Sequence, residues 1–310
     1  LPFDGHTILN STHAMLLETI PSSLIIAGAG AIGVEYAHYF AAMGARVTIV
    51  EMLDHLVPIE DPDVSATLEK AFTKRNIDLH LGRRIDKAEP EGAGVTVSLD
   101  NGEQLQAGKL LVSIGVIPNI SSLGLEAAGI LLDRTAIAVD DHCRTSVTGI
   151  YAIGDVTRPP WLAHKASAEG IIAAESIAGL DPHPLDYDYI PACTFCSPQI
   201  ASIGLTEPKA RERHGDVKIG RFFFRANGRA LAGGDYDGFI KTIFHPATEE
   251  LLGVHMIGPE VTELISEASA FRTLQAKGSQ IHSIIHPHPT LAEAFPEAVA
   301  AAFGTAIHGA

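Results

Sequence analysis

A glycine-rich turn at residues 28–33, Gly-Ala-Gly-Ala-Ile-Gly, constrains the fold more than any other feature of the sequence. Residues 23–27 before it have the pattern of a short buried strand, and residues 31–43 place apolar side chains at helical spacing. A second strand, rich in β-branched residues, follows at 46–51. A strand, a helix and a strand joined by such short connections form a βαβ unit with parallel strands. The sequence therefore predicts an α/β domain in this part of the chain.

The spacing of the glycines in this turn predicts a binding site for a dinucleotide. Gly28 allows a tight turn at the strand end, Gly30 lets the backbone approach a pyrophosphate, and Gly33 lets the helix pack closely on the strand. The helix N-terminus offers free N–H groups to the phosphates. Glu51 ends the second strand, where a carboxylate accepts hydrogen bonds from the ribose hydroxyls and repels a 2′-phosphate. No arginine follows it directly, so we predict NAD rather than NADP.

The rest of the chain is predicted to contain a β excursion and a C-terminal α+β region. A helix is expected near 63–74, an apolar strand at 150–153 and an alanine-rich helix at 163–178. The excursion has three strand pieces, of which a turn at Asp100-Asn101-Gly102 joins the last two; they lie near 78–81, 95–99 and 109–114. After a proline-rich stretch, four strands precede two helices, the order of an α+β domain: strands 200–204, 217–224, 239–244 and 251–257, helices 260–277 and 291–302.

Length and charge exclude several classes of protein. The chain has 310 residues, more than one hydrophobic core usually holds, so two or three domains are expected. A net charge of −15 disfavours nucleic acid as a partner, and no apolar run reaches the roughly 18 residues that span a bilayer. No signal peptide is visible in the first residues. Three cysteines are too few for a disulfide scaffold and favour a cytoplasmic protein.

Two of these cysteines, Cys193 and Cys196, form a C-x-x-C pair. No second pair and no histidines at zinc spacing accompany it. Reactive C-x-x-C pairs gain a low thiol pKa at a helix N-terminus, whereas Pro191, Thr194 and Phe195 favour an extended segment. We therefore interpret both residues as structural cysteines and predict no metal site.

A second motif follows the predicted strand at 150–153. The segment 145–155, which ends in Gly154-Asp155, resembles the second flavin motif of flavoproteins with two dinucleotide sites, whose aspartate contacts the ribityl chain of FAD. The residues Trp161-Leu162-Ala163-His164 come at the spacing where these proteins place a helix start beneath the flavin ring. The resemblance implies an FAD contact in this region.

The third motif is His288 with Glu293, just before and at the start of the last predicted helix. Pro289 and Thr290 suit the first turn and the cap of that helix. Glu293 lies about one turn further and can bend back to one imidazole nitrogen. A carboxylate there fixes the tautomer and raises the basicity of the other nitrogen, as in a general base.

Together these motifs resemble the pyridine nucleotide-disulfide oxidoreductases over essentially the whole chain. Segments 225–231, 253–255 and 306–308 are similar to the dihydrolipoamide dehydrogenases within that family. The implied fold is an α/β Rossmann-like NAD domain at 1–135, a remnant of the FAD-binding and central domain at 136–185, and a C-terminal α+β dimerisation domain at 186–310.

The resemblance also implies roles for individual residues. His288 would be the acid/base for a substrate dithiol, oriented by Glu293. Residues of the first motif and its surroundings would contact NAD: Gly28, Ala29, Gly30, Ala31, Ile32, Gly33, Glu35, Glu51, Ile85 and Gly115. Residues of the second motif would contact FAD: Gly154, Asp155, Trp161, Leu162, Ala163 and His164. Val116 is a departure, because the family often has arginine after the glycine at 115.

The implied function is FAD-dependent oxidation of dihydrolipoamide with NAD as hydride acceptor, in the E3 component of 2-oxo acid dehydrogenase complexes. Lipoyl domains of those complexes and a second copy in a homodimer are the expected partners. No earlier G-x-G-x-x-G and no redox C-x-x-x-x-C occur, so the chain alone is expected to be incomplete and inactive. A relative similar to soluble transhydrogenase and a truncated NAD-binding or dimerising module are the alternatives.

Overall fold

The predicted βαβ unit forms the centre of a parallel sheet in the computed structural model, which describes residues 1–308. The sheet has the order β1-β8-β2-β3-β4, and all its neighbouring strands run parallel. Its strands are β1 (Ile8–Leu9), β2 (Ser23–Ala27), β3 (Arg46–Glu51), β4 (Asp78–Leu81) and β8 (Lys109–Val112). Three helices accompany it: α1 (Ser11–Met15), α2 (Ala31–Ala42) and α3 (Pro62–Lys74). The predicted parallel arrangement is confirmed.

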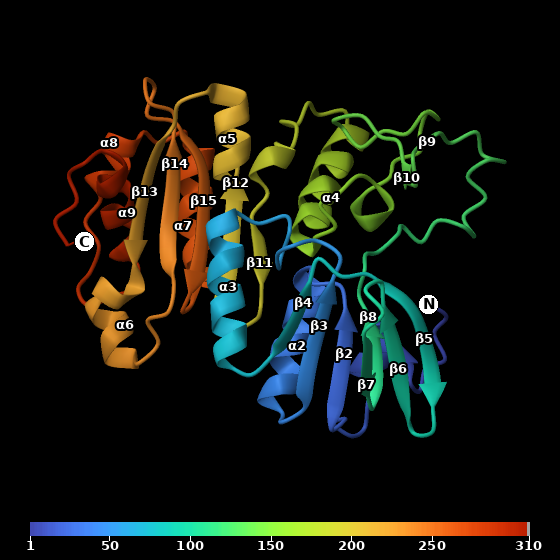
Figure 1. Cartoon of the computed structure of the whole chain (residues 1–310). Helices are drawn as coiled ribbons and strands as arrows, with labels where there is room; N and C mark the ends of the chain where they lie inside the picture. The colour runs from blue at the N-terminus through green and yellow to red at the C-terminus, as the bar shows by residue number, and fades with distance from the viewer. Residues whose placement is uncertain (309–310) are drawn as a thin grey trace. The chain divides into compact units, whose positions relative to one another are not determined.

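Strand β2 is buried along its whole length because both of its faces are covered. Leu24 and Ile26 belong to a core with residues of α2 and α3, whereas Ile25 and Ala27 belong to a second core with Val97. The second core lies under a three-stranded antiparallel sheet of β5 (Ile85–Glu91), β6 (Gly94–Leu99) and β7 (Gln104–Ala107). Figure 1 shows this small sheet beside β2 and β8.

The β excursion exists, but two of the three strands assigned to it belong to the parallel sheet instead. The turn at Asp100-Asn101-Gly102 joins β6 to β7, and the strand at 109–112 is β8 of the parallel sheet. The strand at 78–81 is β4, also in the parallel sheet. Strands β5 and β7 were not predicted, because their side chains are exposed or half-buried and so give no apolar pattern. Strand β5 also contains Pro90 and four charged residues.

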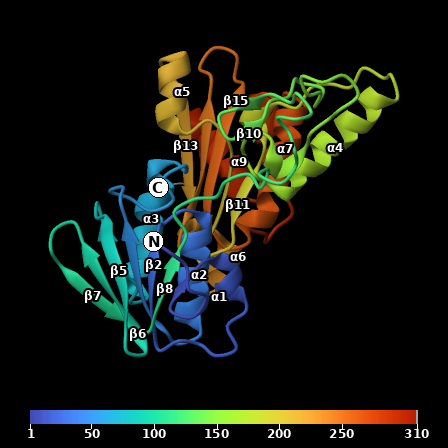
Figure 2. The same ribbon diagram turned by 90° about the vertical axis from the view of Figure 1, so that its right-hand side faces the viewer.

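The C-terminal region is an antiparallel sheet of order β11-β12-β15-β14-β13 with helices on both faces. Its strands are β11 (Ala192–Thr194), β12 (Gln199–Gly204), β13 (Lys218–Phe223), β14 (Phe239–Phe244) and β15 (Leu251–Gly258). Helices α7 (Val261–Thr273) and α9 (Ala294–Ala302) pack on one face, and α3 and α5 (Glu207–His214) contact β15 on the other (Figures 1 and 2). The four predicted strands and the two predicted helices are confirmed, and these helices begin one to three residues later than expected. Strand β11 was not predicted, and shorter helices interrupt the expected order of strands before helices.

Three helices of this region were missed. Helix α5 has the sequence Glu-Pro-Lys-Ala-Arg-Glu-Arg-His, which carries no apolar period, and the other two are only six and five residues long. They are α6 (Gly228–Gly233) and α8 (Gly278–His282), and a 3₁₀ turn η3 (Phe224–Ala226) precedes α6.

Residues 116–192 form a separate compact unit, distinct from the unit made of residues 1–115 and the chain from Cys193 onward. It contains β9 (Leu132–Asp133), β10 (Ala136–Ile137), η1 (Gly154–Val156), α4 (Ala163–Ile177) and η2 (Tyr187–Tyr189). Helix α4 confirms the helix expected at 163–178. The strand expected at 150–153 is absent: only Tyr151 bridges, to Arg144, because no neighbouring strand extends the pairing. Among the described residues, no helix is both long and apolar enough to cross a membrane.

Candidate functional site

The glycine-rich turn lies where β2 passes into α2, and each glycine has a geometric reason. Gly28 has φ +99°, and a Cβ there would lie 2.5 Å from the main-chain oxygen of Ser113. A Cβ at Gly33 would lie 2.0 Å from the oxygen of Gly28, so the helix packs directly on the turn. A Cβ at Gly30 would meet nothing within 4 Å, which leaves that side of the backbone open for a ligand. In residues 1–308 no side chain caps α2 at Gly30, and no acidic residue lies in its first turn.

Glu51 lies beside this turn at the end of β3. Its Oε2 accepts a hydrogen bond from the N–H of Ala29 at 2.7 Å, and its Oε1 accepts one from the N–H of Leu53 at 2.9 Å. The residue is only 9% exposed. Each carboxylate oxygen keeps a further lone pair, so the fixed carboxylate can still accept ribose hydroxyls. Glu51 therefore lies next to the glycine turn, as the sequence predicted.

The other residues assigned to NAD lie at varied positions. Gly115 follows β8 with φ +135° and open space around it, close in sequence to the Ser113 that packs on Gly28. Ile85 begins β5 and packs against the core below the small sheet. Glu35 points from α2 to the C-terminal region, where its Oε1 accepts the N–H of Phe195 at 2.7 Å.

Arg83 is a neighbour of this site that sequence reasoning missed. Its N–H donates to the main-chain oxygen of Glu51 at 2.9 Å, because β4 runs parallel to β3 and brings the following loop to the same edge. Its side chain is exposed. Arg83 could have been placed near Glu51 only if β4 had been predicted to pair with β3, because the residues that directly follow Glu51 include no arginine.

His288 and Glu293 meet as predicted. The Nδ1 atom of His288 lies 2.9 Å from Oε1 of Glu293, and Oε2 of Glu293 accepts the N–H of Thr290 at 2.8 Å. Partial burial alone would raise the pKa of Glu293, but the Thr290 N–H and His288 hold it below its usual value. The His288 side chain is 78% exposed. The carboxylate therefore holds Nδ1 of the imidazole, and Nε2 on the exposed side chain is open to a substrate.

The helix behind this pair begins later than predicted. Helix α9 starts at Ala294, with Glu293 at the N-cap position, so Thr290 does not cap it. Instead, the Thr290 hydroxyl donates to the oxygen of Pro287 at 2.8 Å. This hydrogen bond closes a short turn within the loop that carries His288. The loop is irregular and ends where α9 begins.

Two partners of this loop were not identified from the sequence. The Nε2 atom of His286 lies 2.6 Å from Oε1 of Glu267 on α7, and the His286 side chain is only 6% exposed. Asn227, which is 4% exposed, donates from Nδ2 to the oxygen of Thr290 at 3.0 Å. These contacts join residues far apart in sequence, so the local pattern carried no signal for them.

In the separate unit of residues 116–192, the predicted flavin residues lie on η1 and at the start of α4. Asp155 is exposed on η1, and Gly154 before it is buried with φ +76°. Trp161 donates from Nε1 to the oxygen of Thr157 at 2.9 Å, and Nε2 of His164 lies 2.7 Å from the oxygen of Pro191. Leu162 is the N-cap of α4, which begins at Ala163.

The cysteines show no sign of an activated thiol. All three are free, and burial raises the pKa of Cys193 and raises that of Cys196 to about 12. Cys193 lies on β11 in an extended segment, as predicted. Within residues 1–308, no group of three or more His, Cys, Asp or Glu could hold a metal ion.

Comparison with known proteins identifies the family of this chain. Residues 2–170 match the model described as pyridine nucleotide-disulphide oxidoreductase, and residues 190–299 match the dimerisation domain of that family. Dihydrolipoyl dehydrogenases of Zymomonas mobilis and Rhizobium etli are 46% and 42% identical, each over 98% of this chain. A third, from Bacillus subtilis, is 43% identical over 99% of it. The chain spans 66%, 64% and 66% of the lengths of these three relatives.

Solved structures agree with these matches. LpdA from Mycobacterium tuberculosis has a TM-score of 0.89 and 30% identity over 96% of this chain and 65% of its own. The HOCl-induced flavoprotein disulfide reductase RclA from Escherichia coli has a TM-score of 0.89 and 27% identity over 94% of this chain and 68% of its own. FAD and NAD are the cofactors of the matched family. The prediction from the three motifs is confirmed: this chain belongs to the pyridine nucleotide-disulphide oxidoreductase family.

Proposed function

We propose that the protein works as a dihydrolipoyl dehydrogenase, which oxidises dihydrolipoamide with NAD as the final acceptor. The observation that carries this proposal is the His288–Glu293 pair, whose geometry suits transfer of a thiol proton. The relatives at 46%, 42% and 43% identity, all of which bear that name, support it.

The residues of the chain fit both cofactors. The open face at Gly30, the uncapped start of α2 and the buried carboxylate of Glu51 suit the pyrophosphate and ribose of NAD. The exposed Asp155 on the η1 turn suits the ribityl hydroxyls of FAD. When bound, FAD and NAD would supply the electron-accepting chemistry that amino-acid side chains lack.

The contribution of His288 is to hold and release a proton. Glu293 accepts a hydrogen bond from Nδ1 of His288, which fixes the tautomer and leaves Nε2 as the basic atom. Nε2 would take the proton from the substrate thiol, because the thiolate and not the thiol is the reactive nucleophile. Glu293 stabilises the imidazolium that results.

We also propose the partners and the setting of this activity. Lipoyl domains of 2-oxo acid dehydrogenase complexes would be the substrates, and the match to a dimerisation domain at residues 190–299 supports a homodimer. The three free cysteines are typical of the reducing cytoplasm. We propose that residues 1–135 bind NAD, that residues 136–185 contribute to FAD binding, and that residues 186–310 form the dimerisation domain.

The test is an assay of the protein expressed from its complete reading frame with FAD, dihydrolipoamide and NAD. We expect NADH to form, and we expect His288→Gln to slow its formation by about 10²- to 10⁴-fold, the range for loss of a general acid–base. His308→Gln is the matched control, since His308 forms a similar exposed pair with Glu297 at 2.9 Å. Equal activity of the His288→Gln variant and the unchanged protein would refute the assignment.

A further inference from the structure

A buried ion pair on α4 encloses the backbone of the turn that carries Asp155. The side chains of Lys165 and Glu169 lie one helical turn apart and are both 0% exposed. Nζ of Lys165 lies 3.2 Å from Oε2 of Glu169. Burial of two charges costs free energy unless their donors and acceptors are all hydrogen-bonded. The other contacts of this pair are therefore informative about its role.

Both main-chain polar groups of Gly154 are bound by this pair. The N–H of Gly154 donates to Oε2 of Glu169 at 2.7 Å, and its carbonyl oxygen accepts from Nζ of Lys165 at 3.0 Å. The hydroxyl of Thr157 donates to the same carbonyl at 2.7 Å. Lys165 also donates to the oxygen of Arg158 at 3.1 Å. Buried side chains of this unit therefore bind both the N–H and the carbonyl oxygen of Gly154.

The turn also lies in contact with α4. Gly154 has φ +76°, and a Cβ added to it would lie 3.4 Å from the Cβ of Ala166 on α4. The helix therefore lies against the turn as well as bonding to it. Asp155 is the next residue, and it is exposed. The backbone of Gly154 is fixed inside, and the carboxylate that follows it faces outward.

The network continues to the end of the unit through Tyr187 on η2. The Tyr187 hydroxyl donates to Oε1 of Glu169 at 2.6 Å, and the guanidinium of Arg158 lies 3.7 Å from the centre of its ring. Arg158 in turn pairs with Asp141 at 3.3 Å. Burial and the Glu169 carboxylate raise the pKa of Tyr187 to about 12, so its hydroxyl stays a donor. Glu169 thus keeps acceptor contacts to three different segments.

We propose that Lys165 and Glu169 are positioning residues for flavin binding, which fix the Gly154 backbone so that Asp155 meets a row of ligand hydroxyls. This inference rests on the proposed FAD-dependent function. A well-packed apolar pair at these positions could give similar stability, whereas only a donor and an acceptor can bind both polar groups of Gly154. The pair therefore has a positioning role that stability alone does not account for.

The test compares Glu169→Gln and the double variant Lys165→Met with Glu169→Leu, in the protein expressed from its complete reading frame. Three quantities are measured: the melting temperature, the hydrogen exchange of peptides that cover residues 152–157 without FAD, and the Kd for FAD. We expect both variants to speed exchange and to weaken FAD binding by about tenfold or more, the effect of about one lost charge-assisted hydrogen bond. The double variant recovers most of the melting temperature, since it buries no unpaired charge.

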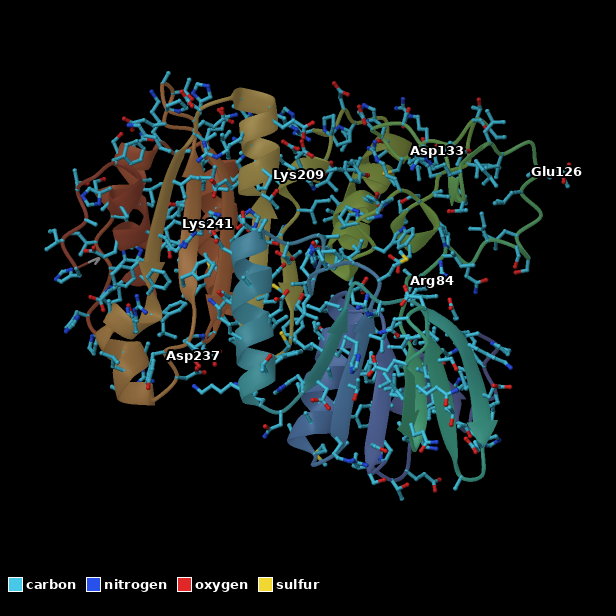
Figure 3. The ribbon with its side chains drawn as sticks, in the orientation of Figure 1. Arg84, Glu126, Asp133, Lys209, Asp237 and Lys241 are labelled. Atoms are coloured by element: carbon cyan, nitrogen blue, oxygen red, sulfur yellow. The ribbon has the colours of Figure 1, made fainter. Side chains whose placement is uncertain are left out.

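Two controls separate positioning from stability. Glu126→Gln changes an exposed glutamate of the same unit, which points away from the ribbon in Figure 3, and should alter none of the three quantities. Ile172→Ala removes apolar packing at a residue of α4 that is 8% exposed, and should lower the melting temperature without weakening FAD binding as strongly as Glu169→Gln. Normal FAD binding by the double variant would overturn the inference. Failure of the unchanged protein to bind FAD, with residues 152–157 protected, would instead overturn the proposed function.

Discussion

Asn227 donates a hydrogen bond from Nδ2 to the main-chain oxygen of Thr290, 3.0 Å away, and so ties the start of α6 to the loop that carries His288. The same side chain accepts the N–H of Ala230 through Oδ1 at 3.0 Å, as the N-cap of α6. Because one amide group makes both contacts, the position of the loop and the start of the helix depend on each other.

Replacement of Asn227 should separate these two contacts. Asn227→Ser keeps an oxygen to accept the Ala230 N–H but removes the amide donor to Thr290, whereas Asn227→Ala loses both. We expect Asn227→Ala to lower the free energy of unfolding by about 1–2 kcal/mol, the usual effect of a lost cap. Asn227→Ser should lower it less, yet slow dihydrolipoamide oxidation as much as Asn227→Ala. Urea unfolding and steady-state kinetics measure the two effects, and full activity of Asn227→Ser would contradict the role of the Thr290 contact.

Glu51 should set the choice between NADH and NADPH. Glu51→Gln keeps an oxygen that can accept one of the two N–H groups now bound, but removes the charge that repels a 2′-phosphate. We expect the Kd for NADH to rise about tenfold and the Kd for NADPH to fall, since Arg83 lies at the same sheet edge. Calorimetric titration of the chain with each nucleotide measures this. Weakening of both nucleotides by the same factor would show that Glu51 acts only on the shape of the turn.

Loss of Lys241 should weaken the contact between α3 and the C-terminal sheet. Its Nζ lies 2.8 Å from Asp61, 2.6 Å from Asp63 and 2.7 Å from Glu207, and its side chain is 1% exposed. Burial alone would lower the pKa of Lys241, but hydrogen bonds to these carboxylates raise it. Figure 3 shows Lys241 among the strands beside α3.

Lys241→Met should lower the free energy of unfolding by about 3–5 kcal/mol, because it leaves the fully buried carboxylate of Asp61 without its cation. The control is Lys74→Met on α3, whose ion pair with Asp237 spans 3.5 Å and is 76% exposed at the lysine. That change should stay within about 0.5 kcal/mol. Denaturant unfolding of both variants decides the matter, and a loss below about 1 kcal/mol for Lys241→Met would contradict the burial argument.

Glu60 should make the stability depend on pH near neutrality. Burial raises the pKa of Glu60 from 4.5 to about 7. Between these values the folded protein keeps a proton that the unfolded chain has lost, so stability falls as pH rises from about 4.5 to about 7. Over this pH range the free energy of unfolding falls by about 3 kcal/mol because of Glu60, at ~1.4 kcal/mol per pKa unit.

Glu60→Gln should remove this component. Because other carboxyl groups add slopes of their own, the informative quantity is the difference in unfolding free energy between the variant and the unchanged protein. We expect that difference to favour the variant increasingly from pH 4.5 to pH 7 and to be constant above it. A difference that does not change with pH would show that Glu60 is ionised in the folded protein throughout.

The glycine turn and the His288–Glu293 pair could be predicted from the sequence because both are local. Three glycines at fixed spacing after an apolar strand restrict the backbone within six residues, and Glu293 lies only five residues from His288. Their geometry is as expected. The start of α9 was misplaced because Thr290 suits a cap, whereas in the folded chain its hydroxyl is bound to Pro287.

Contacts between distant segments could not be predicted in this way. Lys241 meets Asp61 across 180 residues of sequence, and Asn227 meets Thr290 across 63. A lysine in an apolar strand gives no indication of which carboxylates surround it.

The sequence by itself determined the βαβ unit, the family and the residues of the two local motifs, because periodicity and glycine spacing act within one or two elements. Only the tertiary structure decided which sheet each short strand joins, which side chains bury charges and what holds the two motifs in place. Those outcomes depend on desolvation and on hydrogen bonds made by groups that come together only when distant segments pack.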